Sequence, residues 1–262
     1  MSTATTTDGL RAEGVVVRFG GLTALDGVGV HAPPGRITGL IGPNGAGKTT
    51  LFNVCSGLQA AAEGSVRLDG VDLGRAGPSR RARMGLGRTF QRLELFTSMT
   101  VRENVEFGAE ARSLSWDPVS QLGLRAGGRS RRRAMRSDAE EILELTGLAP
   151  LADRVVGSLS TGQGRVVELA RAMARRPRIL LLDEPSSGLD PNESREFGRQ
   201  LRRLVDERGI GILMVEHDMS LVLDICDWIF VLDFGRPLMA GTAAQVRVSA
   251  EVQAAYLGKE AA

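Results

Sequence analysis

The hydrophobic pattern of the chain consists mainly of short apolar runs that end at glycine, proline or charged residues. Residues 15–17 and 28–32 predict two early strands. Residues 36–41 predict a third strand, which leads directly into a glycine-rich loop, and a helix is expected to begin near Lys48. Strand-like runs also cover residues 65–68 and 85–90.

Between about residue 92 and residue 157 the pattern changes to helical spacing. Residues 100–110 and 137–146 predict helices, the second through apolar positions such as Ile142 and Leu145. Short apolar runs then return, and each is followed by charged residues or glycine, as is typical of buried parallel strands. These runs cover residues 179–182, 210–215 and 228–232.

The pattern therefore predicts an α/β core that is split in the sequence by a mainly helical insert. We expect a disordered tail over residues 1–9 and the core over residues 10–91 and 159–240. The helical insert covers residues 92–158 and includes an arginine-rich segment, and a helical extension covers residues 241–262.

Composition places the protein among ordinary globular chains. Its 262 residues are 42% hydrophobic and 24% charged, and a net charge of +2 is too small to indicate nucleic acid. Cys55 and Cys226 lie far apart, so we interpret both as buried thiols in a reducing compartment. Neither a signal peptide nor an apolar stretch of about 20 residues is visible, which predicts a cytoplasmic protein without a membrane span.

The distribution of positive charge draws attention to one lysine. Among 33 lysine and arginine residues, only Lys48 and Lys259 are lysines. Lys48 belongs to the phosphate-binding pattern G-x-x-x-x-G-K-[ST], in which a compact ammonium reaches the β- and γ-phosphates. The candidate nucleotide-binding residues are Gly42, Pro43, Asn44, Gly45, Ala46, Gly47, Lys48, Thr49 and Thr50.

A nucleoside triphosphate and Mg²⁺ are the cofactors that this loop predicts. Glycines allow the backbone N–H groups to approach phosphate closely, and the hydroxyl of Thr49 is placed to bind Mg²⁺. The alternative is a glycine-rich turn that binds nothing, which does not explain the full pattern.

Two acidic residues follow the apolar run 179–182. Asp183 and Glu184 are expected at the carboxyl edge of a parallel sheet, where ligands of such folds bind. Asp183 is the candidate for Mg²⁺, directly or through water, and Glu184 is the candidate to polarise the attacking water. Taken alone, an acidic strand end is more often a turn or a cap.

A second candidate anion site precedes a predicted helix over residues 165–174. Ser160, Gly162 and Gln163 lie in the segment LSTGQG, and a small glycine-bearing segment that opens a helix can bind phosphate. The simpler interpretation of this segment alone is a helix cap.

The order of these motifs resembles the ATP-binding subunit of an ABC transporter. GPNGAGKTT, GRTFQ, LSTGQ, ILLLDEP, SSGLD and MVEHD follow one another as in that family, and the resemblance covers about residues 10–257. It implies a P-loop NTPase core with a mostly parallel sheet, an antiparallel N-terminal β-subdomain and an inserted α-helical subdomain.

The resemblance also implies roles for single residues. Phe19 would stack on adenine, where the family usually has tyrosine, and a phenyl face is sufficient for stacking. Gln91 would contact Mg²⁺ or the water and sense the membrane partner. Asp190 falls in the D-loop, and His217 would touch the γ-phosphate, the alternative being an ordinary strand-end histidine. Lys48, Gln91, Glu184 and His217 are thus the catalytic candidates, and Thr49, Gln91 and Asp183 the metal candidates.

Ser160 and Gly162 resemble the signature that binds the γ-phosphate held by a second subunit. The usual signature is LSGGQ, so Thr161 replaces a glycine, and Gly164 stands where a larger polar residue is common. Ser160, Gly162 and Gln163 retain the helix N-terminus, and the nucleotide affinity of the signature is the property that these two departures are expected to change.

The family's organisation implies several partners for this chain. They are a second ATPase subunit, identical or paralogous, two membrane permease subunits and, indirectly, a solute-binding protein, with no nucleic acid. The expected location is cytoplasmic, on the inner face of the cell membrane.

The substrate is a finer inference. RFGGLTAL, GRTFQ and the closing GTAAQV and AAYLG together resemble the larger ATPase of branched-chain amino acid importers. Urea or amide importers, a lipid or lipopolysaccharide exporter and a soluble non-transport ATPase are the alternatives. The arginine-rich segment 125–136 is either a solvated loop or a contact for anionic lipid, with nucleic acid a lesser alternative.

Overall fold

The computed structural model describes residues 9–91, 93–113, 133 and 135–257. Residues 1–8 of the predicted tail and most of the arginine-rich segment lie outside this range. The chain divides into two compact units. Unit 1 comprises Met1–Gln91, Arg178–Ser187 and Ser194–Ala262, and unit 2 comprises Arg92–Pro177 and Gly188–Glu193.

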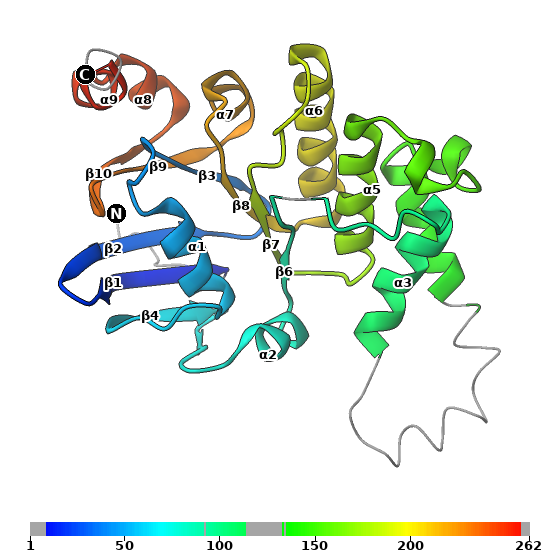
Figure 1. The fold of residues 1–262 in the computed structure, drawn as a ribbon, viewed down its shortest axis with the longest axis horizontal. Coiled ribbons are helices and arrows are strands. Elements are labelled where there is room, and N and C mark those ends of the chain that lie inside the picture. Colours follow the sequence, from blue (N-terminus) through cyan, green and yellow to red (C-terminus); the bar gives the residue numbers. More distant parts are fainter. Residues whose placement is uncertain (1–8, 92, 114–132, 134, 258–262) are drawn as a thin grey trace, which may run out of the picture. The chain divides into compact units, whose positions relative to one another are not determined.

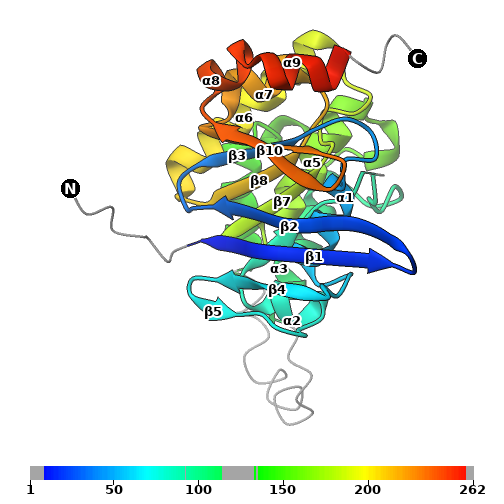
Figure 2. The same cartoon turned by 90° about the vertical axis from the view of Figure 1, so that its left-hand side faces the viewer.

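The first sheet of unit 1 is antiparallel. It contains β1 (Leu10–Phe19), β2 (Leu22–Ala32), β4 (Glu63–Leu68) and β5 (Val71–Asp72) in the order β2-β1-β4-β5. Figure 2 shows β2, β1 and β4 side by side. The early strands predicted at residues 15–17 and 28–32 lie within β1 and β2, which extend further because residues on either side, both buried and exposed, also pair.

The second sheet has six strands in the order β10-β9-β3-β8-β7-β6. All neighbours are parallel except β10, which pairs antiparallel with β9. All five residues of β3, β7 and β8 are buried, as expected for parallel strands covered on both faces. The strands are β3 (Ile37–Ile41), β6 (Leu86–Arg88), β7 (Ile179–Asp183), β8 (Gly211–Val215), β9 (Trp228–Asp233) and β10 (Arg236–Gly241).

Helix α1 (Lys48–Ser56) follows β3 and contributes to the core that joins the two sheets (Figure 1). Its Leu51 and Phe52 are fully buried, in one cluster with Val15 of β1 and Leu181 of β7. Further helices of this unit are α2 (Pro78–Arg83), α7 (Met219–Ile225), α8 (Ala243–Val248) and α9 (Ala250–Leu257). The α/β architecture predicted from the sequence is confirmed.

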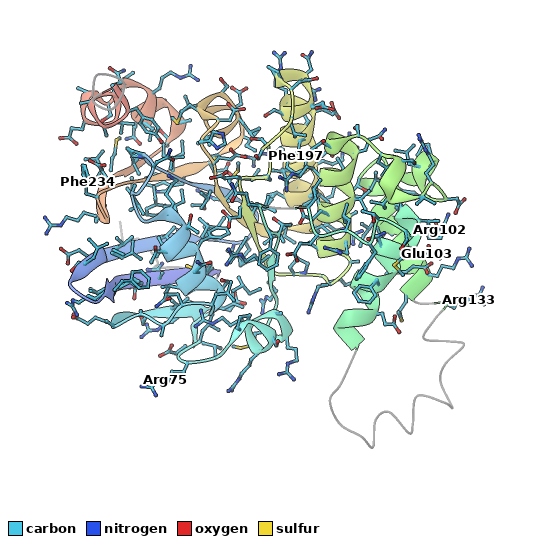
Figure 3. The ribbon with its side chains drawn as sticks, viewed as in Figure 1. Arg75, Arg102, Glu103, Arg133, Phe197 and Phe234 are labelled. Atoms are coloured by element: carbon cyan, nitrogen blue, oxygen red, sulfur yellow. The ribbon has the colours of Figure 1, made fainter. Side chains whose placement is uncertain are left out.

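Unit 2 is mainly helical. It contains α3 (Val101–Ser113), a helix over residues 135–145, and α5 (Thr161–Met173), and α3 lies against α5. Their backbones approach so closely that a Cβ at Gly108 would stand 2.2 Å from the carbonyl oxygen of Arg171. Arg102 of α3, labelled in Figure 3, pairs with Glu140 of the following helix and with Asp153.

Helix α6 (Pro191–Arg208) begins in the last segment of unit 2 and continues in unit 1. Throughout the described ranges, every helix is too short or too polar to cross a membrane.

Candidate functional site

The glycine-rich loop joins β3 to α1, as the sequence predicts. Gly42, Gly45 and Gly47 have φ angles of 150°, 81° and 95°, in the region that favours glycine. At Gly47 a Cβ would also stand 2.6 Å from Cδ2 of Leu25 and 2.9 Å from the carbonyl oxygen of Ala24. The loop therefore has this shape only with glycine at these positions.

Lys48 is 9% exposed and points back over the loop. Its Nζ donates hydrogen bonds to the carbonyl oxygens of Gly42 at 2.5 Å and Pro43 at 2.9 Å. An ammonium held this way stands beside the N-terminus of α1, where backbone N–H groups already favour an anion.

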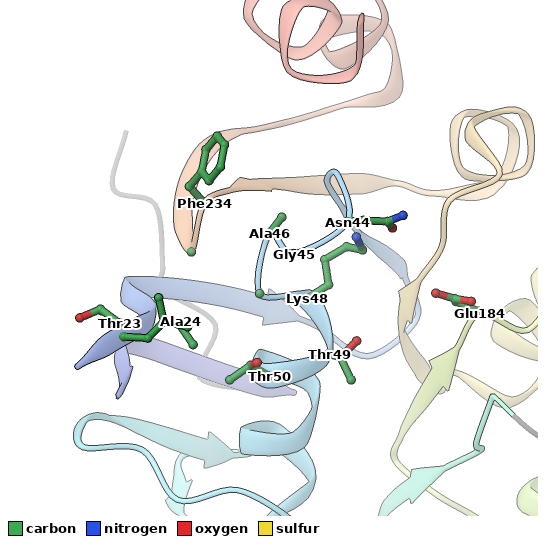
Figure 4. Close-up of a pocket in the computed structure, with 13 residues that line it drawn as sticks. Thr23, Ala24, Asn44, Gly45, Ala46, Lys48, Thr49, Thr50, Glu184 and Phe234 are labelled. Carbon is green, nitrogen blue, oxygen red and sulfur yellow. The ribbon is translucent and has the colours of Figure 1, made fainter. Parts of the chain in front are cut away.

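A cavity of about 350 Å³ lies over this loop (Figure 4). Glu184 borders it opposite the loop, and Phe234 and Gly235 of the turn between β9 and β10 border it on another side. Phe19, at the end of β1, is 50% exposed and is not among the lining residues. The lining residues are Leu22, Thr23, Ala24, Asn44, Gly45, Ala46, Gly47, Lys48, Thr49, Thr50, Glu184, Phe234 and Gly235.

Asp183 ends β7 and is paired with Arg88, the last residue of β6. Nη2 of Arg88 lies 3.0 Å from Oδ2 of Asp183, and Nη1 donates to Asn53 Oδ1 and Ser56 Oγ of α1. Burial raises the pKa of the Asp183 carboxyl, and the charge and hydrogen bond of Arg88 oppose that rise. Arg88 therefore favours the ionised carboxylate at a position where burial alone would disfavour it.

Glu184 stands where three segments of unit 1 meet. Its Oε2 accepts a 2.8 Å hydrogen bond from Nε2 of Gln91 and lies 3.9 Å from Nδ1 of His217. Its φ of 46° is in the left-handed region, and its N–H donates to the carbonyl oxygen of Val215 at 2.9 Å. A strained backbone at a candidate catalytic residue persists only where the surroundings fix it. The structure thus brings together Gln91, Glu184 and His217, three of the four catalytic candidates.

Ser160 and Gln163 form a capping box at the start of α5 in unit 2. Ser160 Oγ accepts from the Gln163 N–H, and Gln163 Oε1 accepts from the Ser160 N–H, both at 3.2 Å. Thr161, the unusual residue of this segment, is exposed in the first turn of the helix. An L-residue adopts helical backbone there without strain, so the segment opens a regular helix despite the substitution.

The remaining sequence-predicted residues of unit 2 lie close to that helix start. A Cβ at Gly162 would stand 2.8 Å from Oε1 of Glu193, so the two positions are in contact. Oδ1 of Asp190 accepts from the N–H groups of Asn192 and Glu193 and so caps the start of α6.

Sequence reasoning missed several residues of the site. Arg88 lies three positions before Gln91, in the same GRTFQ segment, and Glu216 lies directly before His217. Phe234 has a φ of 41° and is 77% exposed, and its position in an F-G pair after an apolar strand indicates only a turn.

Comparison with known proteins identifies what this arrangement resembles. The sequence profile of the family described as "ABC transporter" matches residues 25–187. The high-affinity branched-chain amino acid transport ATP-binding proteins BraF of Pseudomonas aeruginosa and LivG of Escherichia coli are each 40% identical over 250 residues. In both cases the match covers 95% of this chain and 98% of the relative.

Solved structures agree with these sequence relatives. The ADP conformation of an ATP-binding cassette from an ABC transporter has a TM-score of 0.82 at 32% identity, over 96% of this chain and 99% of that one. A nucleotide-free cassette has a TM-score of 0.81 at 33% identity, over 95% and 98%.

Proposed function

The chain belongs to the ABC transporter family as an ATP-binding and ATP-hydrolysing subunit, and on that premise we propose that it energises the import of branched-chain amino acids. The observation that carries the choice of substrate is the end-to-end match with BraF and LivG, which spans 98% of each relative. A sulfate/thiosulfate import ATP-binding protein of Bordetella parapertussis is 38% identical, but the match covers only 63% of it. Sequence identity alone therefore hardly distinguishes the two kinds of importer ATPase, whereas the match over nearly the full length of BraF and LivG favours the branched-chain importers.

In the proposed reaction, Lys48 and the N–H groups of the glycine loop bind the phosphates of ATP. Gln91 and His217 orient the carboxylate of Glu184 and the γ-phosphate relative to each other. Glu184 accepts a proton from the water that attacks the γ-phosphorus, the bond to the β-phosphate oxygen breaks, and ADP and inorganic phosphate leave. Phe19 contributes a face for the adenine ring.

Mg²⁺ fits the donors that this site offers. Thr49 provides a hydroxyl on the cavity, and Asp183, whose Oδ2 accepts a hydrogen bond from Arg88, would hold the metal directly or through water. No group of three or more acidic, histidine or cysteine side chains that could by itself hold a metal ion is found among the described residues. Mg²⁺ does not require such a group, because it is usually bound by one or two protein oxygens together with phosphates and water. When bound, it would neutralise charge that develops on the phosphates.

Each domain of the chain and each partner subunit has a separate role. The core over residues 10–91 and 159–240 binds the nucleotide, the segment 92–158 receives the membrane subunits, and residues 241–262 extend the core. Ser160, Gly162, Gln163 and Asp190 act on the nucleotide held by a second ATPase subunit. Two permease subunits place the assembly on the inner face of the cell membrane, and a solute-binding protein delivers the substrate.

The test uses the Glu184→Gln variant, which should bind ATP, hydrolyse it very slowly and accumulate as a closed dimer. Tagged variant is purified with ATP from its own detergent-solubilised membranes, and the co-purifying chains are identified. The Lys48→Ala/Glu184→Gln double variant is the control, because it should not retain ATP or its dimer partner. We expect two permease chains and a second, shorter ATPase.

Uptake identifies the substrate. Cells that lack this gene are given radiolabelled leucine or urea, with the wild-type or the Glu184→Gln chain restored. Leucine uptake that only the wild-type chain restores is the expected result. Restored urea uptake alone would assign the chain to the urea and amide importers. If cells that lack this gene take up both leucine and urea normally, and the purified complex contains ribosomes or nucleic acid, a transport role is contradicted.

A further inference from the structure

Glu216 is a carboxylate that the reaction described so far does not use. It follows β8 directly, between Val215 and His217, and it is 0% exposed. A carboxylate in such surroundings loses its hydration and must be satisfied by hydrogen bonds or by a cation.

The two oxygens of Glu216 serve two different loops. Oε1 accepts a 2.8 Å hydrogen bond from the N–H of Ser186, in the turn after β7. Oε2 accepts from the N–H of His217 at 3.1 Å and more weakly from that of Asp218 at 3.4 Å, in the loop after β8. One buried side chain thus joins the turn that carries Glu184 to the loop that carries His217.

Backbone N–H groups hold this charge in place of a strong cation. Within the described part of the chain, the basic side chain that lies near Glu216 Oε2 is that of His217, whose Nδ1 is 3.9 Å away. That imidazole nitrogen lies at the same distance, 3.9 Å, from Oε2 of Glu184. The histidine therefore stands between a buried carboxylate that fixes its backbone and the carboxylate that is proposed to activate water.

The turn after β7 needs such an anchor because Glu184 has a left-handed backbone, with a φ of 46°. On one side, the N–H of Glu184 is bonded to Val215. On the other side, two residues further, the N–H of Ser186 is bonded to Glu216. Since Val215 and Glu216 are adjacent, the end of β8 holds the strained residue from both sides.

We propose that Glu216 is a positioning residue for ATP hydrolysis, which fixes Glu184 and His217 relative to each other. The inference rests on the proposed roles of those two residues. It assigns to Glu216 an effect on turnover rather than on nucleotide binding, because no atom of Glu216 borders the cavity.

Glu216→Gln is the main variant, because it keeps the shape of the side chain but replaces one acceptor by an NH₂ donor. The NH₂ group must then face either Ser186 or the pair His217 and Asp218, so one of the two loops loses its acceptor. Glu216→Asp keeps the charge but is one methylene shorter, and it separates loss of reach from loss of charge. Glu207→Gln, at an exposed position of α6, is the matched control.

Three quantities are measured on the purified full-length chains. Single-turnover hydrolysis of radiolabelled ATP gives the rate, equilibrium dialysis gives the Kd for ATP, and hydrogen exchange gives the protection of the amides at residues 186 and 217. For both Glu216 variants we expect a rate at least about tenfold lower, a Kd within about twofold of wild type and faster exchange at one or both amides. Glu207→Gln should match the wild-type chain in all three.

The inference is overturned if Glu216→Gln hydrolyses ATP within about twofold of the wild-type rate. It is equally overturned if Glu216→Gln lowers the hydrolysis rate, the affinity for ATP and the exchange protection of β3 all together. That result would mean that the whole fold is destabilised. Glu184→Gln is measured alongside. If Glu184→Gln hydrolyses normally, the proposed role of Glu184 is wrong, whereas a slow Glu184→Gln beside a fast Glu216→Gln rejects only the role of Glu216.

Discussion

The side-chain amide of Gln91 donates a 2.8 Å hydrogen bond to Oε2 of Glu184, across 93 positions of sequence. The bond occupies an oxygen of the carboxylate that is proposed to polarise water. Gln91 is thus placed to control the orientation of that carboxylate while remaining exposed itself.

Replacing Gln91 by glutamate should slow hydrolysis more than replacing it by alanine. Alanine removes the hydrogen bond, whereas glutamate places a second negative charge within about 3 Å of Glu184 and repels it. We expect the hydrolysis rate to fall about tenfold in Gln91→Ala and further in Gln91→Glu. Equal rates for the two variants in single-turnover assays would show that the orientation of Glu184 does not depend on this contact.

Lys48→Ala should abolish tight binding of ATP. Lys48 is 9% exposed and is the ammonium next to the N–H groups that are proposed to bind phosphate, so its removal should raise the Kd at least about 30-fold. Lys48→Arg should not restore binding, because the guanidinium is too broad for a loop that already bonds Nζ to Gly42 and Pro43. Isothermal titration with ATP measures the Kd, and detectable hydrolysis by Lys48→Ala would contradict the site assignment.

Removing Arg88 should destabilise the fold as well as the proposed metal site. The Arg88–Asp183 pair is 11% exposed on each side, and Arg88→Met would leave a buried carboxylate without its partner. We expect a loss of about 3 kcal/mol in the free energy of unfolding. Arg236→Met is the control, since its pair with Asp26 is 73% and 47% exposed and should contribute less than about 1 kcal/mol. Urea unfolding compares the two, and equal effects would contradict the role of burial.

Phe19→Ala should weaken ATP binding about five- to tenfold without changing the affinity for inorganic triphosphate, because stacking acts on the base alone. Phe19→Tyr should bind as the wild-type chain does. Phe234→Ala is the informative comparison, since Phe234 lines the cavity and Phe19 does not. If only Phe234→Ala weakens ATP binding, the adenine prediction for Phe19 is wrong.

Neither cysteine should react with Ellman's reagent at pH 8 while the protein is folded. Burial raises the pKa of both Cys55 and Cys226 to about 12, and the thiolate is the reactive form. Since the folded pKa lies above the ordinary thiol pKa of 9.0, the stability linked to the neutral thiols is complete below pH 9 and is lost between pH 9 and pH 12. Both thiols should react in urea, and rapid reaction without urea would contradict the burial.

The sequence predicts those features of the site that depend on local order along the chain. The strand before Gly42, the helix from Lys48 and the acidic end of β7 follow from apolar runs and glycine spacing, and all three are observed. The helices at residues 100–110 and 137–146 follow from periodicity, and the structure has helices at Val101–Ser113 and 135–145.

The features that sequence reasoning missed depend on tertiary contact. Arg88 and Asp183 are 95 positions apart, and Ser186 and Glu216 are 30 positions apart. A pattern of hydrophobic positions gives no sign that a charged residue such as Glu216 is fully buried, because burial of a carboxylate depends on N–H groups supplied by a distant turn. The position of Phe234 beside the glycine loop likewise follows from the sheet order and not from its neighbours in sequence.

The strand order also determines when the nucleotide site can form during synthesis. Strand β3, which leads into the glycine loop, pairs with β8 and β9 and so has no sheet neighbour before residue 211. A nascent chain that ends at α6 would contain the glycine loop and Glu184 but lack the two strands that hold β3 in place. Contacts at such sequence separation form late and slowly, since the ends of a long loop must first meet. The glycine loop is therefore not held in its nucleotide-binding shape until β8 and β9 have been synthesised, and a nascent chain without these strands is expected not to bind ATP.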